Sequence, residues 1–412
     1  MSSIHRDLDT PDSPFEGLGF ASNVLLQERS AEADTRPTLC FPLAGDSLGG
    51  SHHSLLGLLQ QLDQRKYRIL VVVEVPGGKL STFFANFEQC ADPAAPKTSF
   101  TADKRMGLFK FATTLTGLMA RRRFLREQNV RIVHTNDGRS HATWALAAKL
   151  AGARLLWHHR ADPNARGLRF LAPLVADQIV TVSRFSLPQG KSSRAVRDAE
   201  VIFSPFDTDI VVDRSVQRKL LCRELSLADD AFIVGFFGNL IDRKRPIKFV
   251  EAIAHLQKLV SVPVYGVIFG EAEDPAMEDQ IRQRTLELGI RHQIHLMGYR
   301  SPGSDWIAAC DVLSVPAVGE PLGRTLIEAM VVGTPVVATR SGGNPEAILD
   351  GLGILVTPDD PAAMAQGCAR IAHGFEGDAA MIAQAKISAA TRFTRTRHLN
   401  SVEQVYQRLL AL

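Results

Sequence analysis

Short apolar segments alternate with longer amphipathic segments along most of this chain. The segment 67–75, YRILVVVEV, is almost continuously apolar and rich in β-branched residues, which is typical of a parallel strand covered on both faces. The segment 246–260, PIKFVEAIAHLQKLV, carries its apolar residues at helical spacing. Repeated alternation of this kind predicts βαβ units and parallel sheets.

The alternation falls into two series, with a polar break around residues 205–230. We therefore predict an α/β protein with two doubly wound, Rossmann-like domains that face a cleft. Because open parallel sheets bind ligands beyond the carboxyl ends of their strands, the functional loops should line that cleft. The predicted parts are a mobile N-terminal extension, two domains and a final helix, at residues 1–36, 37–210, 211–395 and 396–412.

Composition excludes several classes of protein. Lys and Arg number 47 and Asp and Glu 44 in the 412 residues, a balance that gives no reason to expect nucleic acid binding. The five cysteines are scattered, which argues against a disulfide framework or a zinc site and fits a reducing cytoplasm. No apolar run reaches the length of a membrane span, and the N-terminus does not resemble a signal peptide. We expect a cytoplasmic protein.

The segment 319–348 carries the most informative chemistry. Glu320 stands just before a predicted helix, and Gly323 allows close approach of backbone and ligand. Free N–H groups at a helix start bind anions such as phosphate. Glu328 follows eight residues after Glu320, which predicts that both carboxylates lie on roughly the same side. Such a pair indicates a nucleotide-sugar site, in which one carboxylate holds the sugar and the other the ribose. The alternative is two ordinary surface carboxylates, with Glu320 favoured by the helix dipole.

The residues around this pair resemble the retaining glycosyltransferases of family four. That family shows an EPxGRTxxEAM stretch, then PVVA, a GG pair followed by Glu, and a DGxG turn. In this chain the four elements occupy residues 320–330, 335–338, 342–346 and 350–353. The likeness is clearest over residues 231–360 and weaker from about 38 to 210.

The resemblance implies the GT-B fold, with an acceptor-side N-terminal domain, a C-terminal nucleotide-sugar domain and a final helix that packs back on the N-terminal domain. It implies that Glu320 contacts the donor sugar and Glu328 the ribose. The start of the following helix would hold the diphosphate through Leu322, Gly323, Arg324 and Thr325.

The loop GNLIDRKRP, residues 238–246, resembles a second element of the family, in which an Arg and a Lys five residues later bind the diphosphate. Fixed cations there help most as the departing diphosphate gains negative charge. Lys244 occupies the Lys position, but Asn239 replaces the Arg and supplies no charge. Arg243 or Arg245 would compensate from the same loop. The alternative is a solvated basic turn.

Two further candidates lie in the N-terminal series. Gly50, in a GG pair before a predicted helix, resembles the family's first glycine-rich loop, which approaches the diphosphate or the acceptor. His158 and His159 end a predicted strand where the family places an active-site His or Arg. Because adjacent strand residues point to opposite sides, only one of the two faces the cleft. We favour His159, with His158 and Arg160 as alternatives.

The segment 106–130 predicts an amphipathic helix with four arginines. Such a helix can lie on an anionic membrane, so peripheral contact with the inner face of the membrane is one hypothesis. An ordinary solvated helix is the other.

The expected function is retaining transfer of a sugar from a nucleotide-diphosphate-sugar to an acceptor hydroxyl, in polysaccharide or glycoconjugate biosynthesis. The acceptor would be a saccharide, a lipid-linked molecule or a small molecule. The candidate catalytic residues are His159, His158, Lys244 and Glu320. We expect no metal ion and no cofactor, because the nucleotide-sugar is a co-substrate and no DxD-like site follows a strand. The alternatives are a nucleotide-sugar epimerase on the same fold and a non-catalytic nucleotide-sugar-binding protein.

Overall fold

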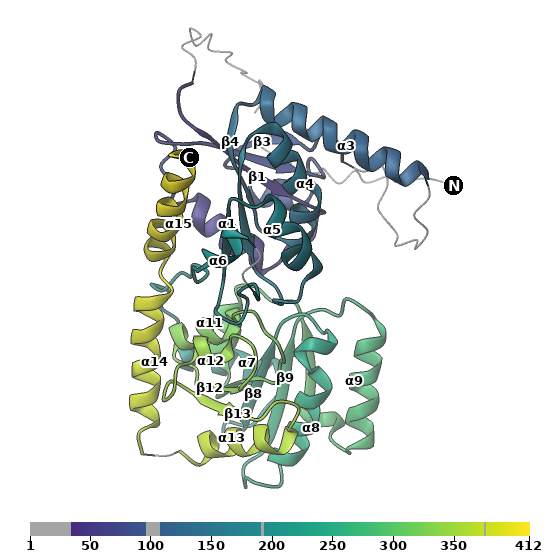
Figure 1. Ribbon diagram of the computed structural model, residues 1–412. Helices are drawn as coiled ribbons and strands as arrows, with labels where there is room; N and C mark the ends of the chain where they lie inside the picture. The colour runs from purple at the N-terminus through teal and green to yellow at the C-terminus, as the bar shows by residue number, and fades with distance from the viewer. Residues whose placement is uncertain (1–33, 96–107, 191–192, 375) are drawn as a thin grey trace, which may run out of the picture. The chain divides into compact units, whose positions relative to one another are not determined.

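The strand and helix pattern of the sequence forms two parallel sheets with helices beside them (Figure 1). The part of the chain from Arg36 to Leu412 is one compact unit. The predicted N-terminal extension, residues 1–36, falls almost wholly outside the described residues. The computed structural model describes residues 34–95, 108–190, 193–374 and 376–412.

The first sheet has seven strands in the order β3-β2-β1-β4-β5-β6-β7, all paired in parallel. The strands are β1 Thr38–Leu43, β2 Arg68–Val73, β3 Glu88–Ala91, β4 Val130–Thr135, β5 Arg154–His159, β6 Gln178–Thr181 and β7 Glu200–Val201. The helices of this half are α1 Gly50–Leu59, α2 Lys79–Phe83, α3 Leu108–Glu127, α4 Gly138–Ala151, α5 Ala172–Val175 and α6 Arg194–Arg197. A π-helical turn, Gly167–Leu171, precedes α5.

The second sheet repeats the same arrangement with six strands, in the order β10-β9-β8-β11-β12-β13. Its strands are β8 Phe232–Phe237, β9 Val264–Phe269, β10 Ile294–Gly298, β11 Val312–Val315, β12 Val336–Thr339 and β13 Ile354–Val356. Its helices and the two that close the chain are α7 Arg214–Leu225, α8 Pro246–Leu256, α9 Ala276–Glu287, α10 Gly303–Ala309, α11 Arg324–Val332, α12 Asn344–Ala347, α13 Pro361–His373, α14 Asp378–Arg392 and α15 Arg395–Leu410. In both sheets the strand order reverses beside the first strand of its series, as in a Rossmann-like sheet. The predicted doubly wound α/β class is confirmed.

Both faces of the first sheet are buried. Leu39 and Phe41 of β1 share one core with Tyr406 of α15, whereas Cys40 shares the core on the other face with Trp144 of α4. A strand with two buried faces has no polar side, which explains the continuous apolar runs of the sequence. The C-terminal helix α15 therefore covers one face of the first sheet.

The segment after residue 76 contains α2 and β3. Strand β3 pairs only with β2, at the edge of the sheet. Its four residues are exposed or half-buried. An edge strand with little burial has no strong apolar signature, so the pattern could not reveal it.

Helix α3 corresponds to the predicted basic helix, whose first two residues lie outside the described part of the chain. Its arginines contact the protein itself. Arg121 is buried and pairs with Asp92 at 2.7 Å, and Arg123 pairs with a glutamate one turn on, at 2.6 Å. Arg122 and Arg126 donate to carbonyls in the last turn of α4. Contact with a membrane through this helix stays a prediction. Across the described residues, no helix combines the length and the apolar character that a membrane span requires.

Candidate functional site

Glu320 lies in the loop that joins β11 to α11, at the carboxyl edge of the second sheet. Two glycines back this loop. A Cβ atom on Gly342 would lie 2.4 Å from the Glu320 carbonyl oxygen, and one on Gly343 would lie 2.3 Å from the Pro321 carbonyl oxygen. The Gly343 N–H donates to the Glu320 carbonyl at 2.7 Å. The GG pair of the sequence is therefore needed to hold the Glu320 backbone in place.

Two cations from the loop after β8 converge on the Glu320 carboxylate. Oε2 of Glu320 lies 2.5 Å from Nη1 of Arg243 and 3.1 Å from Nζ of Lys244. Burial by itself would raise the pKa of Glu320. The charges and hydrogen bonds of Lys244 and Arg243 outweigh burial and hold this pKa below its ordinary value. A buried carboxylate thus stays ionised between two fixed cations.

The other two residues considered in this loop have different partners. The Asn239 side chain donates to Glu273 at 3.0 Å. Arg245 pairs with Asp242 at 2.6 Å and with Asp359 at 2.7 Å. Of the residues that would compensate for Asn239, the structure brings Arg243 to Glu320 and directs Arg245 elsewhere.

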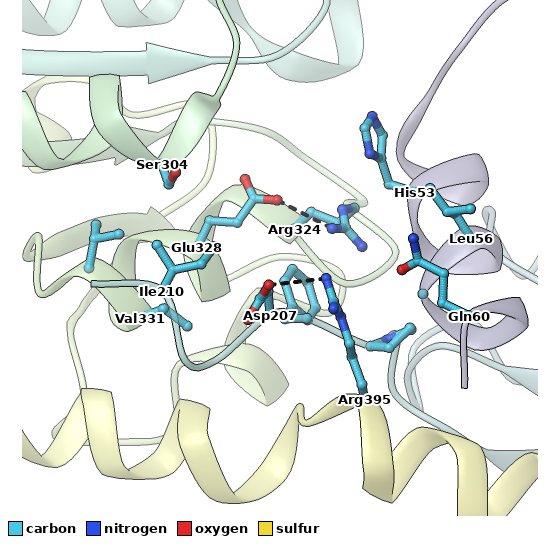
Figure 2. Close-up of a pocket in the computed structure, with 14 residues that line it drawn as sticks. His53, Leu56, Gln60, Asp207, Ile210, Ser304, Arg324, Glu328, Val331 and Arg395 are labelled. Atoms are coloured by element: carbon cyan, nitrogen blue, oxygen red, sulfur yellow. Dashed lines mark hydrogen bonds and ion pairs between the residues drawn. The ribbon is translucent and has the colours of Figure 1, made fainter. Parts of the chain in front are cut away.

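Glu328 lies on α11, beside a cavity of about 230 Å³ (Figure 2). Its carboxylate accepts from Nη2 of Arg324 at 3.3 Å, one turn earlier. Side chains of α1, including His53, lie across the cavity (Figure 2). Glu320 and Glu328 therefore have separate cationic partners, and only Glu328 lies on the helix.

Arg324 connects this half of the site to the first sheet. Its Nη1 donates to the Ser54 hydroxyl of α1 at 2.7 Å, and its guanidinium lies 4.3 Å from the centre of the Phe206 ring. A Cβ atom on Gly50, the first residue of α1, would meet Arg324 at 2.7 Å. Thus Gly50 and Arg324, two of the predicted donor-binding residues, lie side by side. Of the remaining predicted residues in this loop, Leu322 and Gly323 are buried and Thr325 is half-buried.

A second cavity, of about 220 Å³, opens at the carboxyl ends of β4 and β5. It is lined by His159 at the end of β5, by Arg160 directly after it, by Asp137 at the start of α4 and by Ser51 at the start of α1. His159 is 3% exposed, and its Nε2 lies 2.9 Å from the Asp162 carbonyl oxygen. Burial lowers the pKa of His159, although nearby carbonyl groups oppose this effect.

His158 is buried away from this cavity, in a stack of three imidazoles. The centres of the His134 and His398 rings lie 5.3 and 5.9 Å from the centre of the His158 ring. Nε2 of His134 lies 3.1 Å from Nδ1 of His158, and Nδ1 of His134 lies 2.6 Å from the Tyr406 hydroxyl. Burial, followed by the charge of Arg160, holds the pKa values of all three imidazoles far below the ordinary value. The stack therefore joins β4 and β5 to α15 as neutral rings.

The part of the chain that contains the second sheet is similar to a known family. Residues 218–388 match the family described as glycosyl transferases group 1. This match spans less than half of the chain. It is 34% identical over 168 residues to the D-inositol 3-phosphate glycosyltransferase of Corynebacterium efficiens, covering 39% of this chain and 38% of that protein. It is 29% identical over 183 residues to the lipopolysaccharide core biosynthesis mannosyltransferase LpsB of Rhizobium meliloti, covering 43% and 52%. The chain thus matches only about two fifths to one half of these relatives' own length.

Solved structures extend the likeness of the fold to both sheets. The structure of Anabaena Alr3699/HepE in complex with UDP-glucose has a TM-score of 0.76 with this chain. It is 20% identical and covers 90% of this chain and 99% of that one. The predicted GT-B architecture, two Rossmann-like domains in one chain, is confirmed.

The sequence analysis missed several contacts in and beside the matched region 218–388. The Glu346 carboxylate accepts from the backbone N–H groups of Arg184 and Phe185 at 2.7 and 2.8 Å.

The sequence analysis also did not single out three histidines of the first half and the last helix. His134 lies near the end of β4 and His141 lies in the helix that follows it, and the carboxyl end of β4 neighbours that of β5. Their positions near the end of a strand could have identified His134 and His141 as candidates, because residues that follow adjacent parallel strands meet at one edge of the sheet. His398 gave no comparable signal, since it joins the stack from the C-terminal helix. Within the described ranges, no three His, Cys, Asp or Glu side chains are grouped to hold a metal ion.

Proposed function

We propose that this protein is a glycosyltransferase that moves a sugar from a nucleotide-diphosphate-sugar to a hydroxyl of an acceptor, with retention at the anomeric carbon. The observation that carries the proposal is the convergence of Arg243 and Lys244 on Glu320 within a group 1 domain. Two cations at the carboxyl edge of a parallel sheet suit a diphosphate, whose charge increases as it leaves the sugar.

In the proposed donor complex, the diphosphate takes over Arg243 and Lys244 from Glu320. The freed Glu320 carboxylate then accepts hydrogen bonds from hydroxyls of the donor sugar. Glu328, beside the first cavity, accepts from the ribose hydroxyls. The first turn of α11, with Gly323 at its start in the left-handed region (φ +76°), offers backbone N–H groups to the phosphates.

In the proposed transfer, the bond between the anomeric carbon and the diphosphate oxygen breaks, and the acceptor oxygen bonds to the same face of that carbon. The acceptor proton passes to the departing diphosphate oxygen. Arg243 and Lys244 stabilise the charge on the diphosphate at the moment it develops. Neither a metal ion nor a cofactor has a step in this proposal.

The acceptor would enter from the first sheet, where His159 and Arg160 line the second cavity. A role in glycoconjugate or polysaccharide biosynthesis is supported by the names of relatives, one of which is a lipopolysaccharide core mannosyltransferase. We propose His159 as the catalytic histidine on this side, because it lines the cavity and His158 does not.

The test begins with thermal unfolding in the presence of UDP, GDP, ADP and TDP, alone and as nucleotide-sugars, with UDP-glucose included. At 100 times its Kd, a ligand stabilises by about 2.7 kcal/mol, which raises the Tm of a domain of this size by roughly 5–11 °C. We expect one nucleotide to produce this shift and Glu328→Ala to reduce it. Glu278→Ala, on the exposed surface of α9, is the matched control.

The nucleotide-sugars that contain the stabilising nucleotide are then incubated with the protein and a panel of acceptors, and the products are analysed by NMR. A new glycoside with the donor's anomeric configuration supports the proposal, and an inverted one overturns retention. Release of an epimer without any acceptor would favour an epimerase. Binding without turnover under all these conditions would favour a non-catalytic binding protein.

A further inference from the structure

The second cavity is lined by several residues with buried polar atoms that have no hydrogen-bond partner in the described structure. Four of its lining residues each carry a buried polar atom with no hydrogen-bond partner in the described structure. These atoms are Asp137 Oδ2, His141 Nε2, Trp157 Nε1 and Arg160 Nε. Buried polar atoms are usually paired, and leaving one unpaired is costly. The set offers hydrogen-bond donors, from Trp157 and Arg160, and an acceptor, from Asp137, to one ligand.

Arg160 is a cation whose hydrogen-bond partners are all neutral. Its guanidinium donates to the Ser204 hydroxyl at 2.9 Å, to the side-chain amide oxygen of Asn136 at 3.4 Å and to Nδ1 of His158 at 3.4 Å, all neutral partners. Throughout the described part of the chain, no carboxylate forms an ion pair with it. Burial, together with the charge of Arg324, lowers the pKa of Arg160 to about 9. A cation in this position is destabilised until an anion reaches it.

The proposed donor site does not account for this cation. Arg243 and Lys244 follow β8 in the second sheet, whereas Arg160 follows β5 in the first. The cavity of Arg160 is lined by the starts of α1 and α4, on the side where the acceptor would enter. Its lining includes neither Arg243 nor Lys244.

We propose that this cavity binds an acceptor that carries an anionic group, a phosphate or a carboxylate, and that Arg160 recognises that group. The inference rests on the proposed function and names the class of its acceptor. The Arg160 guanidinium pairs with the anion through its planar fork, and the Trp157 N–H is a second donor. The free oxygen of Asp137 accepts from an acceptor hydroxyl; its other oxygen is held by the N–H groups of Arg139 and Ser140.

The same anion chemistry also belongs to the donor diphosphate, so the experiment separates the two sources. Inorganic phosphate is titrated against the protein saturated with UDP, or with whichever nucleoside diphosphate binds, and thermal unfolding is measured against chloride of equal ionic strength. The variants are Arg160→Gln and Arg160→Lys. The matched control is Arg169→Gln, because Arg169 is exposed and does not line the cavity.

We expect phosphate to stabilise the nucleotide-bound wild type and Arg169→Gln alike. Its apparent Kd should rise about tenfold or more in Arg160→Gln, and less in Arg160→Lys, which keeps the charge but loses the fork. Unfolding without phosphate shows whether each variant folds. Equal phosphate affinity in Arg160→Gln and Arg169→Gln would overturn the proposal. If phosphate no longer stabilises the protein once nucleotide is bound, the proposal is also overturned, because the phosphate would then have occupied the diphosphate site of the donor.

Failure of the proposed function would be recognised by a different result, the absence of nucleoside diphosphate binding. If no nucleoside diphosphate binds, the donor site is wrong, whereas phosphate titration of the free protein still reports on Arg160. With a donor in hand, glycerol 3-phosphate should compete with phosphate for wild type, and glycerol should not. Equal competition by the two compounds would contradict an anion-reading cavity.

Discussion

Gly342 lies so close to Glu320 that the space between them admits no side chain. A Cβ atom on Gly342 would lie 2.4 Å from the Glu320 carbonyl oxygen and 2.5 Å from its amide nitrogen, and the Gly342 backbone has a φ of +61°. Both contacts are with backbone, which cannot rotate away as a flexible side chain can. The position of the Glu320 carboxylate therefore depends on a glycine 22 residues further along the chain.

Gly342→Ala should displace the Glu320 loop and reduce transfer by roughly 10²-fold, the effect expected for a shift of about 1 Å in a reacting group. Gly351→Ala is the matched control. Its φ of +85° is also left-handed, but a Cβ atom there meets nothing within 4 Å. Both variants should lose about 1–2 kcal/mol of stability from the backbone conformation. Steady-state transfer rates that fall equally in the two would show that backbone strain, rather than the contact with Glu320, limits activity.

Glu320→Gln should separate donor binding from transfer. In the structure the Glu320 carboxylate neutralises Arg243 and Lys244, so it competes with a diphosphate for them. Removing its charge should tighten UDP binding by about tenfold, which corresponds to about 1.4 kcal/mol, while transfer falls. Calorimetric titration with UDP measures the first effect. Glu328→Gln should instead weaken UDP, since its carboxylate serves the ribose. Weaker UDP binding in Glu320→Gln would contradict the proposed exchange.

Arg243 and Lys244, in the loop after β8, should be needed for transfer, whereas Arg245 in the same loop should not. We expect Lys244→Ala and Arg243→Gln each to lower kcat by roughly 10²–10³-fold, as for loss of one preorganised transition-state contact. Arg245→Gln is the control on the same loop, since Arg245 pairs with Asp242 and Asp359 rather than with Glu320. Full activity of Lys244→Ala would contradict the mechanism.

The stack of His134, His158 and His398 should make the protein less stable in mild acid. Burial holds the pKa of His398 at about 3, and the pKa values of the other two also lie far below 6.5. Below pH 6.5 the unfolded chain binds protons at these positions and the folded chain does not. Stability should therefore fall as pH decreases from about 6.5, by up to about 1.4 kcal/mol per pH unit for each histidine.

Thermal unfolding between pH 7.5 and 5 measures this effect. His398→Gln removes one of the titrating groups and should reduce the slope by about one proton. His292→Gln, outside the stack, is the control for replacing a histidine. A slope that is the same in all three proteins would show that other groups cause the acid sensitivity.

Much of the fold could be predicted because it depends on local pattern. Continuous apolar runs indicated β2 and β8, and helical spacing indicated α8. The edge strand β3 escaped prediction because its residues are only partly buried. In the site, the sequence located the Glu320 loop, the basic β8 loop and the end of β5. It could not decide between Arg243 and Arg245, because the two residues are only two positions apart in one loop and the packing of that loop decides which side chain reaches Glu320.

By itself, the sequence determined the two parallel sheets and the likeness of residues 319–353 to a known glycosyltransferase motif, because strand and helix periodicity and the Glu320–Glu328 motif are properties of neighbouring residues. Only the tertiary structure decided which side chains meet. It brought His158 beside His134 and His398 and Arg324 to Ser54, and within the described residues it left Arg160 without a carboxylate partner. Such pairings join segments that are far apart along the chain. They depend on how whole elements pack, which no local pattern records.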